Sequence, residues 1–196
     1  QISQSATLIM AAEAFGMTNH VMMPYLQRLY YLPLWYAQLF AESLGKNGQG
    51  MLPVKALGSV DQHSLLQLFL DGTDDKLFTI LTASIRGFGN RLNSQFTNAN
   101  FQLDYLAKAS LGDVMQAQQE STIAVLQNKG RLIRHLNISQ FDDFTLGSIM
   151  MHFIIETILI GFAKQLDPFD QPAVEAGKKQ TKALLRAWQG ESLDDQ

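Results

Sequence analysis

One segment of the sequence carries two side chains at a spacing suited to proton transfer. Gln38 and Glu42 are spaced i, i+4 near the end of an apolar, aromatic-rich stretch, and a glycine-rich stretch at residues 45–50 follows. On a helix this spacing places an amide and a carboxylate on one face, and the glycines let the backbone approach a substrate closely. The carboxylate could act as a general base, although a solvated glutamate at a helix end fits the same spacing.

A histidine and a lysine are further candidates. His63 falls in the first turn of a helix expected from about residue 60. The helix dipole there favours the neutral imidazole, and histidine titrates near neutral pH. Lys178 lies near the start of an amphipathic helix, where a cation could stabilise negative charge developing on an oxygen. Both also fit structural roles, namely a helix-start histidine bonded to the backbone and a lysine on a solvated charged face.

The other polar patterns are weaker. His152 and Glu156 are spaced i, i+4 and could present two metal ligands, but no third ligand is evident, so we expect a hydrogen-bonded pair inside a helix. His20 and His135 are expected to be structural. The HExxH, P-loop and GxGxxG patterns do not occur in the sequence. No metal site is therefore expected.

Composition limits the class of protein. The chain has 196 residues, of which 46% are hydrophobic and 17% charged, which is enough apolar material for a sizeable core in one domain. It has 15 Lys+Arg and 18 Asp+Glu, a net charge of −3, so neither a nucleic acid nor an anionic membrane is expected as a partner. The absence of cysteine excludes disulfides, a thiolate zinc site and a cysteine nucleophile, and fits a reducing compartment such as the cytoplasm.

Two segments bear on membrane insertion and targeting. The longest apolar run, at residues 149–163, is interrupted by His152 and Glu156, so it is expected to be too short and too polar to span a bilayer and to form a buried helix. The first residues lack an initiator methionine and the basic region of a signal peptide. We therefore expect a chain cut from a longer one.

Strand-like and helix-like apolar patterns alternate along the chain. Strands are expected at residues 20–24, 52–57, 76–82 and 131–138. Helices are expected at residues 3–16, 33–44, 60–70, 105–108, 112–127, 144–164 and 173–188, and a long connection is expected at 84–103. This alternation indicates an α/β fold, a three-layer αβα sandwich whose mostly parallel sheet is covered by helices on both faces.

Three segments, in this order, resemble the C-terminal half of bacterial glucose-6-phosphate isomerase. They are AESLGK at 41–46, LGSVDQHS at 57–64 and FDQPAVEAGK at 169–178. The resemblance runs from about residue 22 to residue 185. It implies a sugar isomerase (SIS) fold, in which residues 1–189 form the single C-terminal SIS domain of a two-domain enzyme and residues 190–196 form an acidic tail.

The resemblance also implies an activity and roles for particular residues. The complete enzyme would interconvert glucose 6-phosphate and fructose 6-phosphate through an enediol, in glycolysis and gluconeogenesis, without metal or organic cofactor. Glu42 resembles the catalytic base, His63 the histidine that opens the sugar ring in the neighbouring subunit's site, and Lys178 the lysine that assists at the ring oxygen. Gln38 and Gln171 match glutamines that line the sugar-phosphate pocket. A cytoplasmic homodimer is implied.

The sequence departs from the family's pattern in two places. The family's phosphate-holding Ser/Thr loop and GGR motif belong upstream, and no GGR occurs here. A YEHK segment of many members is represented by FIIE at residues 153–156, which indicates a divergent bacterial branch. We therefore expect part of an active site, inactive alone. The alternative is a non-catalytic sugar-phosphate-binding module on the same fold, but a base, a ring-opening acid and an electrophile together favour the enzyme.

Overall fold

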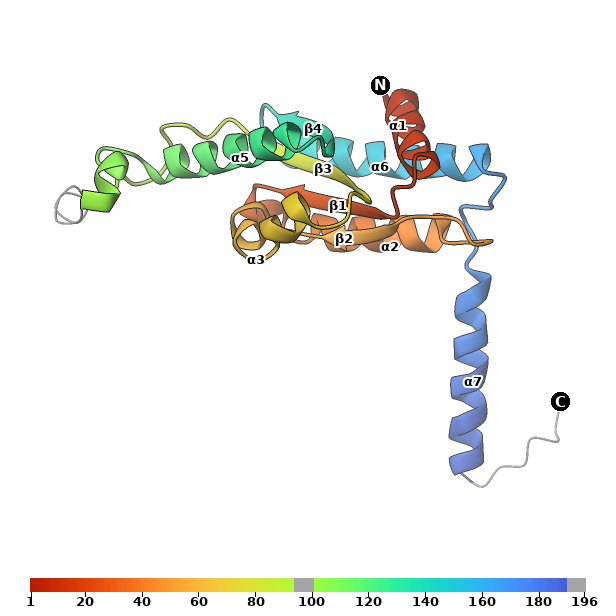
Figure 1. Cartoon of the computed structure of the whole chain (residues 1–196). Coiled ribbons are helices and arrows are strands. Elements are labelled where there is room, and N and C mark those ends of the chain that lie inside the picture. Colours follow the sequence, from red (N-terminus) through yellow and green to blue (C-terminus); the bar gives the residue numbers. More distant parts are fainter. Residues whose placement is uncertain (94–100, 190–196) are drawn as a thin grey trace.

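The computed structural model describes residues 1–93 and 101–189. Its strands form one parallel sheet in the order β2-β1-β3-β4 (Figure 1). The strands are β1 (Asn19–Pro24), β2 (Leu52–Lys55), β3 (Lys76–Ala83) and β4 (Leu132–Ile138). Asn19 pairs with Leu52 and with Lys76, so β1, β2 and β3 begin at the same edge of the sheet.

Helices alternate with the strands along the chain. The α-helices are α1 (Ile2–Ala14), α2 (Leu32–Leu44), α3 (Gly58–Asp71), α5 (Leu111–Asn128), α6 (Asp143–Ala163) and α7 (Pro172–Trp188), and the 3₁₀ helices are η1 (Gln27–Leu29) and η2 (Phe101–Leu106). Core contacts place α1, α2 and α6 on one face of the sheet and α3 and α5 on the other. These layers confirm the predicted three-layer αβα sandwich.

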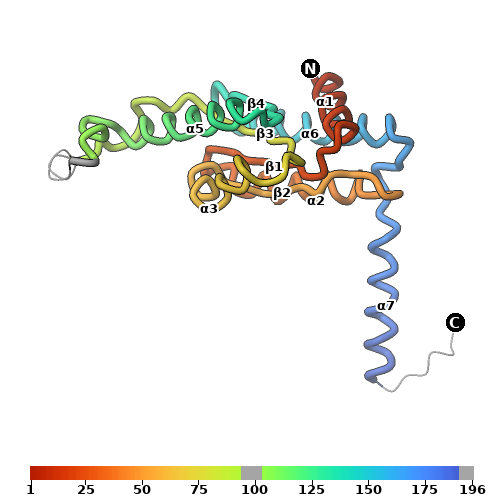
Figure 2. The backbone as a smooth tube through the Cα atoms, in the orientation of Figure 1, coloured from red at the N-terminus to blue at the C-terminus, as the bar shows by residue number. Residues whose placement is uncertain are grey.

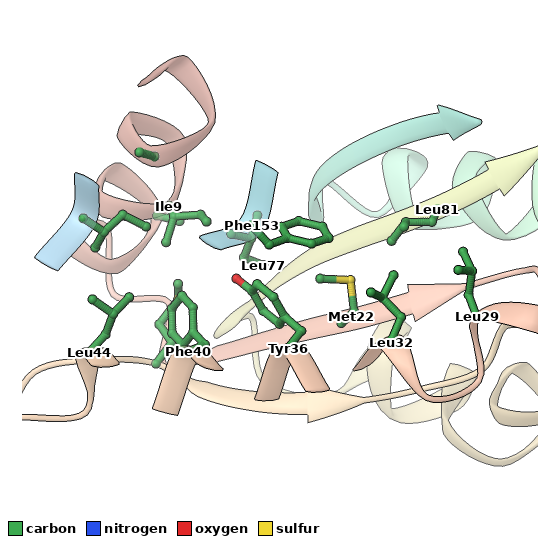
Figure 3. Packing of buried hydrophobic residues seen from close by; sticks show 14 of the residues in the cluster. Ile9, Met22, Leu29, Leu32, Tyr36, Phe40, Leu44, Leu77, Leu81 and Phe153 are labelled. Carbon is green, nitrogen blue, oxygen red and sulfur yellow. The ribbon is translucent and has the colours of Figure 1, made fainter. Parts of the chain in front are cut away.

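The core follows from the alternation of side chains along the strands. Met22 and Leu77 point toward α1, α2 and α6, where they pack with Phe153 (Figure 3). Val21 and Phe78, one position along, point toward α3 and α5. Burying a side chain of this size stabilises the fold by about 1.5–3 kcal/mol. Both faces of the central strands are therefore mostly apolar, as a fully covered parallel sheet requires.

Local sequence signals set the helix starts. Pro33 lies in the first turn of α2 and Pro172 begins α7, positions where the missing amide hydrogen costs nothing. Ser110 and Asp113 form a capping box at the start of α5. Asp142 caps α6 through its side chain. These signals explain why the predicted starts of these helices lie within one or two residues of the observed ones.

Helix α3 begins two residues before its predicted start. The Asp61 carboxylate accepts a hydrogen bond from the Leu57 amide at 2.7 Å, which satisfies a donor at the helix start. Gly58 then lies against the ring of Tyr25, where a Cβ would be 2.4 Å from ring carbons. The glycine is therefore part of the first turn and not a turn residue that precedes the helix.

The connection before α5 also differs from prediction. The α-helix expected at residues 105–108 is wrong, because the 3₁₀ helix η2 ends at Leu106 and Lys108 takes a left-handed φ of 74°. Arg91 forms an isolated bridge with Ser110, which closes the excursion at its base. Residues 94–100 of the predicted connection lie outside the described residues.

Helix α6 is longer and less buried than the apolar run within it predicts. It has 21 residues and a mean hydropathy of 1.8, so by length and composition alone it could cross a membrane, a test that core helices of soluble proteins also pass. Phe153 and Ile160 are buried against the sheet, whereas Phe144 and Phe162 are exposed. Only 28% of the most apolar stretch of α6 is buried. The prediction that this apolar segment is too short to span a bilayer is therefore wrong for the whole helix. The prediction that the helix is buried is correct for one of its faces only.

Helix α7 projects away from the rest of the chain (Figures 1 and 2). None of its residues is buried. Val174, Leu185 and Trp188 are exposed apolar residues on one side of it, and we call these three the α7 stripe. The acidic tail predicted at residues 190–196 lies outside the described residues.

A charged pair is buried between β4 and α6. The Arg134 guanidinium donates to the Glu156 carboxylate and to Ser5, and its Nε donates to the Thr79 hydroxyl at 2.9 Å. His152 Nε2 lies 3.5 Å from the same carboxylate, so the predicted pairing within α6 is present, but the main partner, Arg134, was not predicted. Burial raises the pKa of Glu156, and the His152 and Arg134 contacts outweigh it, so the pKa is lowered.

The contacts of the other two histidines expected to be structural, His20 and His135, agree with such roles. His20 Nε2 lies 2.7 Å from the Thr79 hydroxyl, and the Tyr36 hydroxyl lies 3.1 Å from His20 Nδ1. Burial, together with the charge of Arg134, lowers the pKa of His20 well below its usual value, so this imidazole is neutral at pH 7. His135 is exposed, and its Nε2 lies 2.7 Å from the hydroxyl of Thr82 on β3.

Candidate functional site

The last turns of α2 present the predicted amide and carboxylate. Gln38 Nε2 donates to Glu42 Oε1 at 3.2 Å, and both side chains are exposed. The residues that follow, Ser43 and Leu44, are buried and fix the end of the helix against the core. The structure therefore brings Gln38 and Glu42 together on one exposed face, as the i, i+4 spacing predicts.

The glycine-rich segment after α2 folds tightly. Gly50 has a φ of 99°, and a Cβ there would be 2.9 Å from the Leu44 carbonyl oxygen, so only glycine fits this turn. Lys46 forms an ion pair with Asp170, with 2.7 Å between Nζ and Oδ1. Gln171 follows Asp170 directly, so it lies at the same end of α2 as Glu42.

His63 lies at the opposite edge of the sheet. Glu42 precedes the start of β2, and the nearby Gly50 amide donates to Glu13 at the end of α1, just before β1. His63 instead follows the end of β2, and its neighbour Gln62 accepts a hydrogen bond from Tyr25, the residue after β1, at 3.0 Å. About 20 Å of strand separates the two edges. The structure thus does not bring His63 and Glu42 of one chain together.

His63 also sits deeper in its helix than predicted. Because α3 begins at Gly58, His63 lies in the second turn and is exposed. The influence of the helix dipole is concentrated in the first turn. The predicted placement of His63 in the first turn is therefore wrong.

Lys178 lies two turns along α7 and is exposed. Its Nζ pairs with Glu175 Oε1 at 2.7 Å within the same helix. It also lines a shallow groove of about 690 Å³ with Val174 and Leu185 of the α7 stripe. Lys178 therefore borders the apolar side of α7, which any covering surface would contact, and this distinguishes it from a lysine on the fully solvated side.

A cavity lies elsewhere in the fold, at the carboxyl end of β4. It has a volume of about 590 Å³ between α1 and α6, and its lining includes Arg134, His135 and His152. The sequence did not single out this cavity. Within residues 1–93 and 101–189, no three histidine, aspartate or glutamate side chains are grouped to hold a metal ion.

Sequence reasoning missed the ion pairs around the end of α2. Lys46 and Asp170 both lie in segments that carry the resemblance, yet the sequence predicted no role for either residue. Lys164 pairs with Glu13 at 2.5 Å, joining the ends of α6 and α1. The sequence does show charged residues inside the motifs without an assigned role. It does not show which of them form pairs, because the partners are more than 100 residues apart and only the fold brings them together.

No family model matches the chain. Relatives found by sequence include the probable glucose-6-phosphate isomerase of Haloarcula marismortui, 37% identical over 186 residues, which cover 94% of this chain and 41% of that protein. The glucose-6-phosphate isomerase of Methanocaldococcus jannaschii is 32% identical over 171 residues, covering 87% of this chain and 41% of that protein. The chain thus spans about two fifths of the length of the curated relatives it matches.

Two solved structures resemble the fold. A hypothetical protein from Thermus thermophilus has a TM-score of 0.84 and 31% identity, over 92% of this chain and 44% of that one. A glucose-6-phosphate isomerase from Chlamydia trachomatis has a TM-score of 0.71 over 89% of this chain and 36% of that one, and its 20% identity supports the fold alone. Most of this chain is therefore similar to part of proteins named glucose-6-phosphate isomerase.

Proposed function

We propose that this chain is the C-terminal SIS domain of a glucose-6-phosphate isomerase, with residues 1–189 as one domain. The observation that carries the proposal is the exposed Gln38–Glu42 pair at the end of α2, next to the segment that bears Gln171. The similarity to proteins of that name, over most of this chain, supports it. The proposed reaction interconverts glucose 6-phosphate and fructose 6-phosphate in glycolysis and gluconeogenesis.

Glu42 is the proposed base. Its carboxylate takes the proton from C2 of the open-chain aldose while the C1 oxygen gains a proton, which gives an enediol. The carboxyl group then returns its proton to C1 as the C2 hydroxyl loses one, which gives the ketose. Gln38 donates to one carboxylate oxygen, which orients the group toward one side of α2. No metal or organic cofactor takes part in the proposed step.

The other residues serve ring opening and binding. His63 is proposed to exchange the proton that opens the sugar ring, and Lys178 to stabilise negative charge at the ring oxygen. Gln171 is proposed to line the sugar-phosphate pocket together with Gln38. The groups that hold the phosphate belong to the part of the relatives that this chain does not span.

The position of His63 supports a shared site in a homodimer. Glu42 and His63 of one chain lie at opposite edges of the sheet, so a site that contains both takes its histidine from a second copy. Two-fold dimers are the commonest closed assembly of soluble proteins. We propose a cytoplasmic homodimer whose substrate is a sugar phosphate, without nucleic-acid or membrane partners. The bacterial branch expected from the motifs stays a prediction.

The deciding experiment mixes two inactive variants of the full-length protein, Glu42→Gln and His63→Ala. A mixed dimer contains one site with both residues intact, so subunit exchange at equal concentrations is expected to restore about a quarter of the wild-type activity. The assay follows fructose 6-phosphate formation and consumption. Mixing Glu42→Gln with Lys178→Met is the matched control, because both changes affect residues that the proposal assigns to one subunit.

Three outcomes would overturn parts of this proposal. Recovery no greater than in the control, with exchange demonstrated, would mean that His63 serves its own subunit. A wild-type full-length protein that binds fructose 6-phosphate without turning it over would favour the non-catalytic binding module instead. Isomerase activity that survives Glu42→Gln would remove Glu42 from the role of base.

A further inference from the structure

The segment between α2 and β2 is tied at its start to the segment that leads into α7. Lys46 Nζ lies 2.7 Å from Asp170 Oδ1 and also donates to the Asp167 carbonyl oxygen. The Lys46 side chain is only 11% exposed, whereas Asp170 is 53% exposed. An ammonium group held by two acceptors and largely screened from water is constrained more strongly than a lysine in an exposed pair. Lys46 therefore fixes residues 167–170 against the end of α2.

The same segment is tied at its end through Glu13. One carboxylate oxygen of Glu13 accepts from the Gly50 amide at 2.9 Å, and the other lies 2.5 Å from Lys164 Nζ. Lys164 is the residue that follows α6, so Glu13 joins α1, the start of β2 and the end of α6. Residue 46 is thus held directly by the chain that connects α6 with α7, and residue 50 is linked to that chain through Glu13.

The chain that connects α6 with α7 is itself packed. Leu166 is 4% exposed. Gly161 faces Pro168 so closely that a Cβ at position 161 would lie 3.0 Å from the proline Cβ. The connection is therefore packed against the core as far as Pro168, and its anchored residue, Asp170, stands only two positions before α7 begins.

We infer that Lys46 and Asp170 are positioning residues of the proposed isomerase site. Their ion pair sets the base of α7, and with it Gln171 and Lys178, relative to Glu42 on α2. The inference rests on the proposed function, because Lys46 acts here through Lys178 and Gln171 and does not touch the reacting atoms. A displacement of about 1 Å in a group that stabilises developing charge can slow the reaction about 100-fold.

The first test compares Lys46→Met with Lys129→Met in the full-length protein. Lys129, which follows α5, forms an ion pair at the same 2.7 Å with Asp71 at the end of α3, but both side chains are more than half exposed. Lys46→Met is expected to lower kcat about 10- to 100-fold, with KM changed by less than about threefold. Lys46→Arg should restore part of kcat, and Lys129→Met should leave kcat unchanged. An unchanged kcat in Lys46→Met would overturn the inference.

A mutant cycle distinguishes positioning from a merely structural effect. If Lys46 acts through Lys178, adding Lys46→Met to Lys178→Met should lower kcat little further, because the group it positions is already gone. Losses that multiply across the two positions would show that Lys46 does not act through Lys178. Calculating kcat as the maximal rate divided by the concentration of folded protein removes any contribution from global stability.

A readout without activity separates this inference from the proposed function. Hydrogen exchange of the α7 amides is expected to be faster in Lys46→Met and in Asp170→Asn than in the wild type, and unchanged in Lys129→Met. If the wild type shows no isomerase activity, the proposed function fails while this measurement still tests the anchor. Exchange of α7 that is identical in all variants would overturn the anchor itself.

Discussion

Replacing Arg134 with methionine is expected to lower the free energy of unfolding by about 3–5 kcal/mol, the cost of leaving a buried charge without its partner. Arg134 is 7% exposed, and its partner Glu156 is fully buried. Methionine retains an apolar stem but removes the guanidinium. The Glu156 carboxylate would then remain in the core with His152 and Ser5 as its remaining neighbours.

The pH dependence of this loss follows from the charge on Glu156. Burial raises the pKa of Glu156, and the charge of Arg134 is among the contacts that lower it. Without Arg134 the folded state binds a proton more readily, and a protonated Glu156 no longer needs a cation. The loss of stability of Arg134→Met relative to the wild type is therefore largest near neutral pH and becomes smaller as the pH falls through the acidic range.

The loss at neutral pH can also be expressed as a change in Tm. At about 2–4 °C per kcal/mol for a chain of this size, the expected fall in Tm is about 6–20 °C.

Urea unfolding followed by circular dichroism measures this effect. Lys129→Met removes a cation from an exposed pair and should leave the urea midpoint unchanged, which controls for charge alone. The double variant Arg134→Met with Glu156→Leu removes both charges and should recover most of the loss. A loss below about 1 kcal/mol at pH 7, or a double variant no more stable than Arg134→Met, would refute this account of the buried pair.

Two further predictions concern buried groups. Gly58→Ala places a Cβ 2.4 Å from the ring carbons of Tyr25, so it should destabilise the chain by about 1–3 kcal/mol although alanine favours helices; an unchanged urea midpoint would contradict the close contact. Burial and the charge of Arg134 lower the pKa of His20. Below the usual histidine pKa of 6.5, the unfolded state therefore binds a proton that the folded state does not. The free energy of unfolding should then decrease as the pH is lowered, by up to about 1.4 kcal/mol per pH unit. His20→Asn should remove that component, and an equal slope between about pH 6.5 and 5 in both proteins would exclude His20 as its source.

The fold was predictable where the signals are local. All strand positions follow from short apolar runs, and the parallel sheet follows from their alternation with helices. Predicted helix boundaries were wrong where a contact with a residue distant in sequence decides them. An example is Gly58, whose place in α3 depends on Tyr25. The partial exposure of α6 could not be predicted, because an apolar run does not reveal which of its faces another element covers.

In the candidate site, too, local features were predictable from the sequence and features that depend on the assembled fold were not. The Gln38–Glu42 contact was predictable from an i, i+4 spacing, which any helix enforces. The separation of His63 from Glu42 depends on strand order and direction, which the spacing of motifs does not contain. The Lys46–Asp170 pair joins residues 124 positions apart, so only the assembled fold relates them. The catalytic roles of Glu42, His63 and Lys178 stay predictions.

In the proposed assembly, burial of the projecting helix α7 would be coupled to ordering of that helix. A helix of 17 residues is about 25 Å long, and in proteins most of the stability of a helix comes from packing of its apolar face. Whatever surface covers the α7 stripe must therefore supply the free energy that orders the helix as well as the free energy of contact. Such a step should show a large negative heat-capacity change with an affinity that is modest for the area buried. The strength of assembly then depends on helix propensity along α7 as much as on the contact residues themselves.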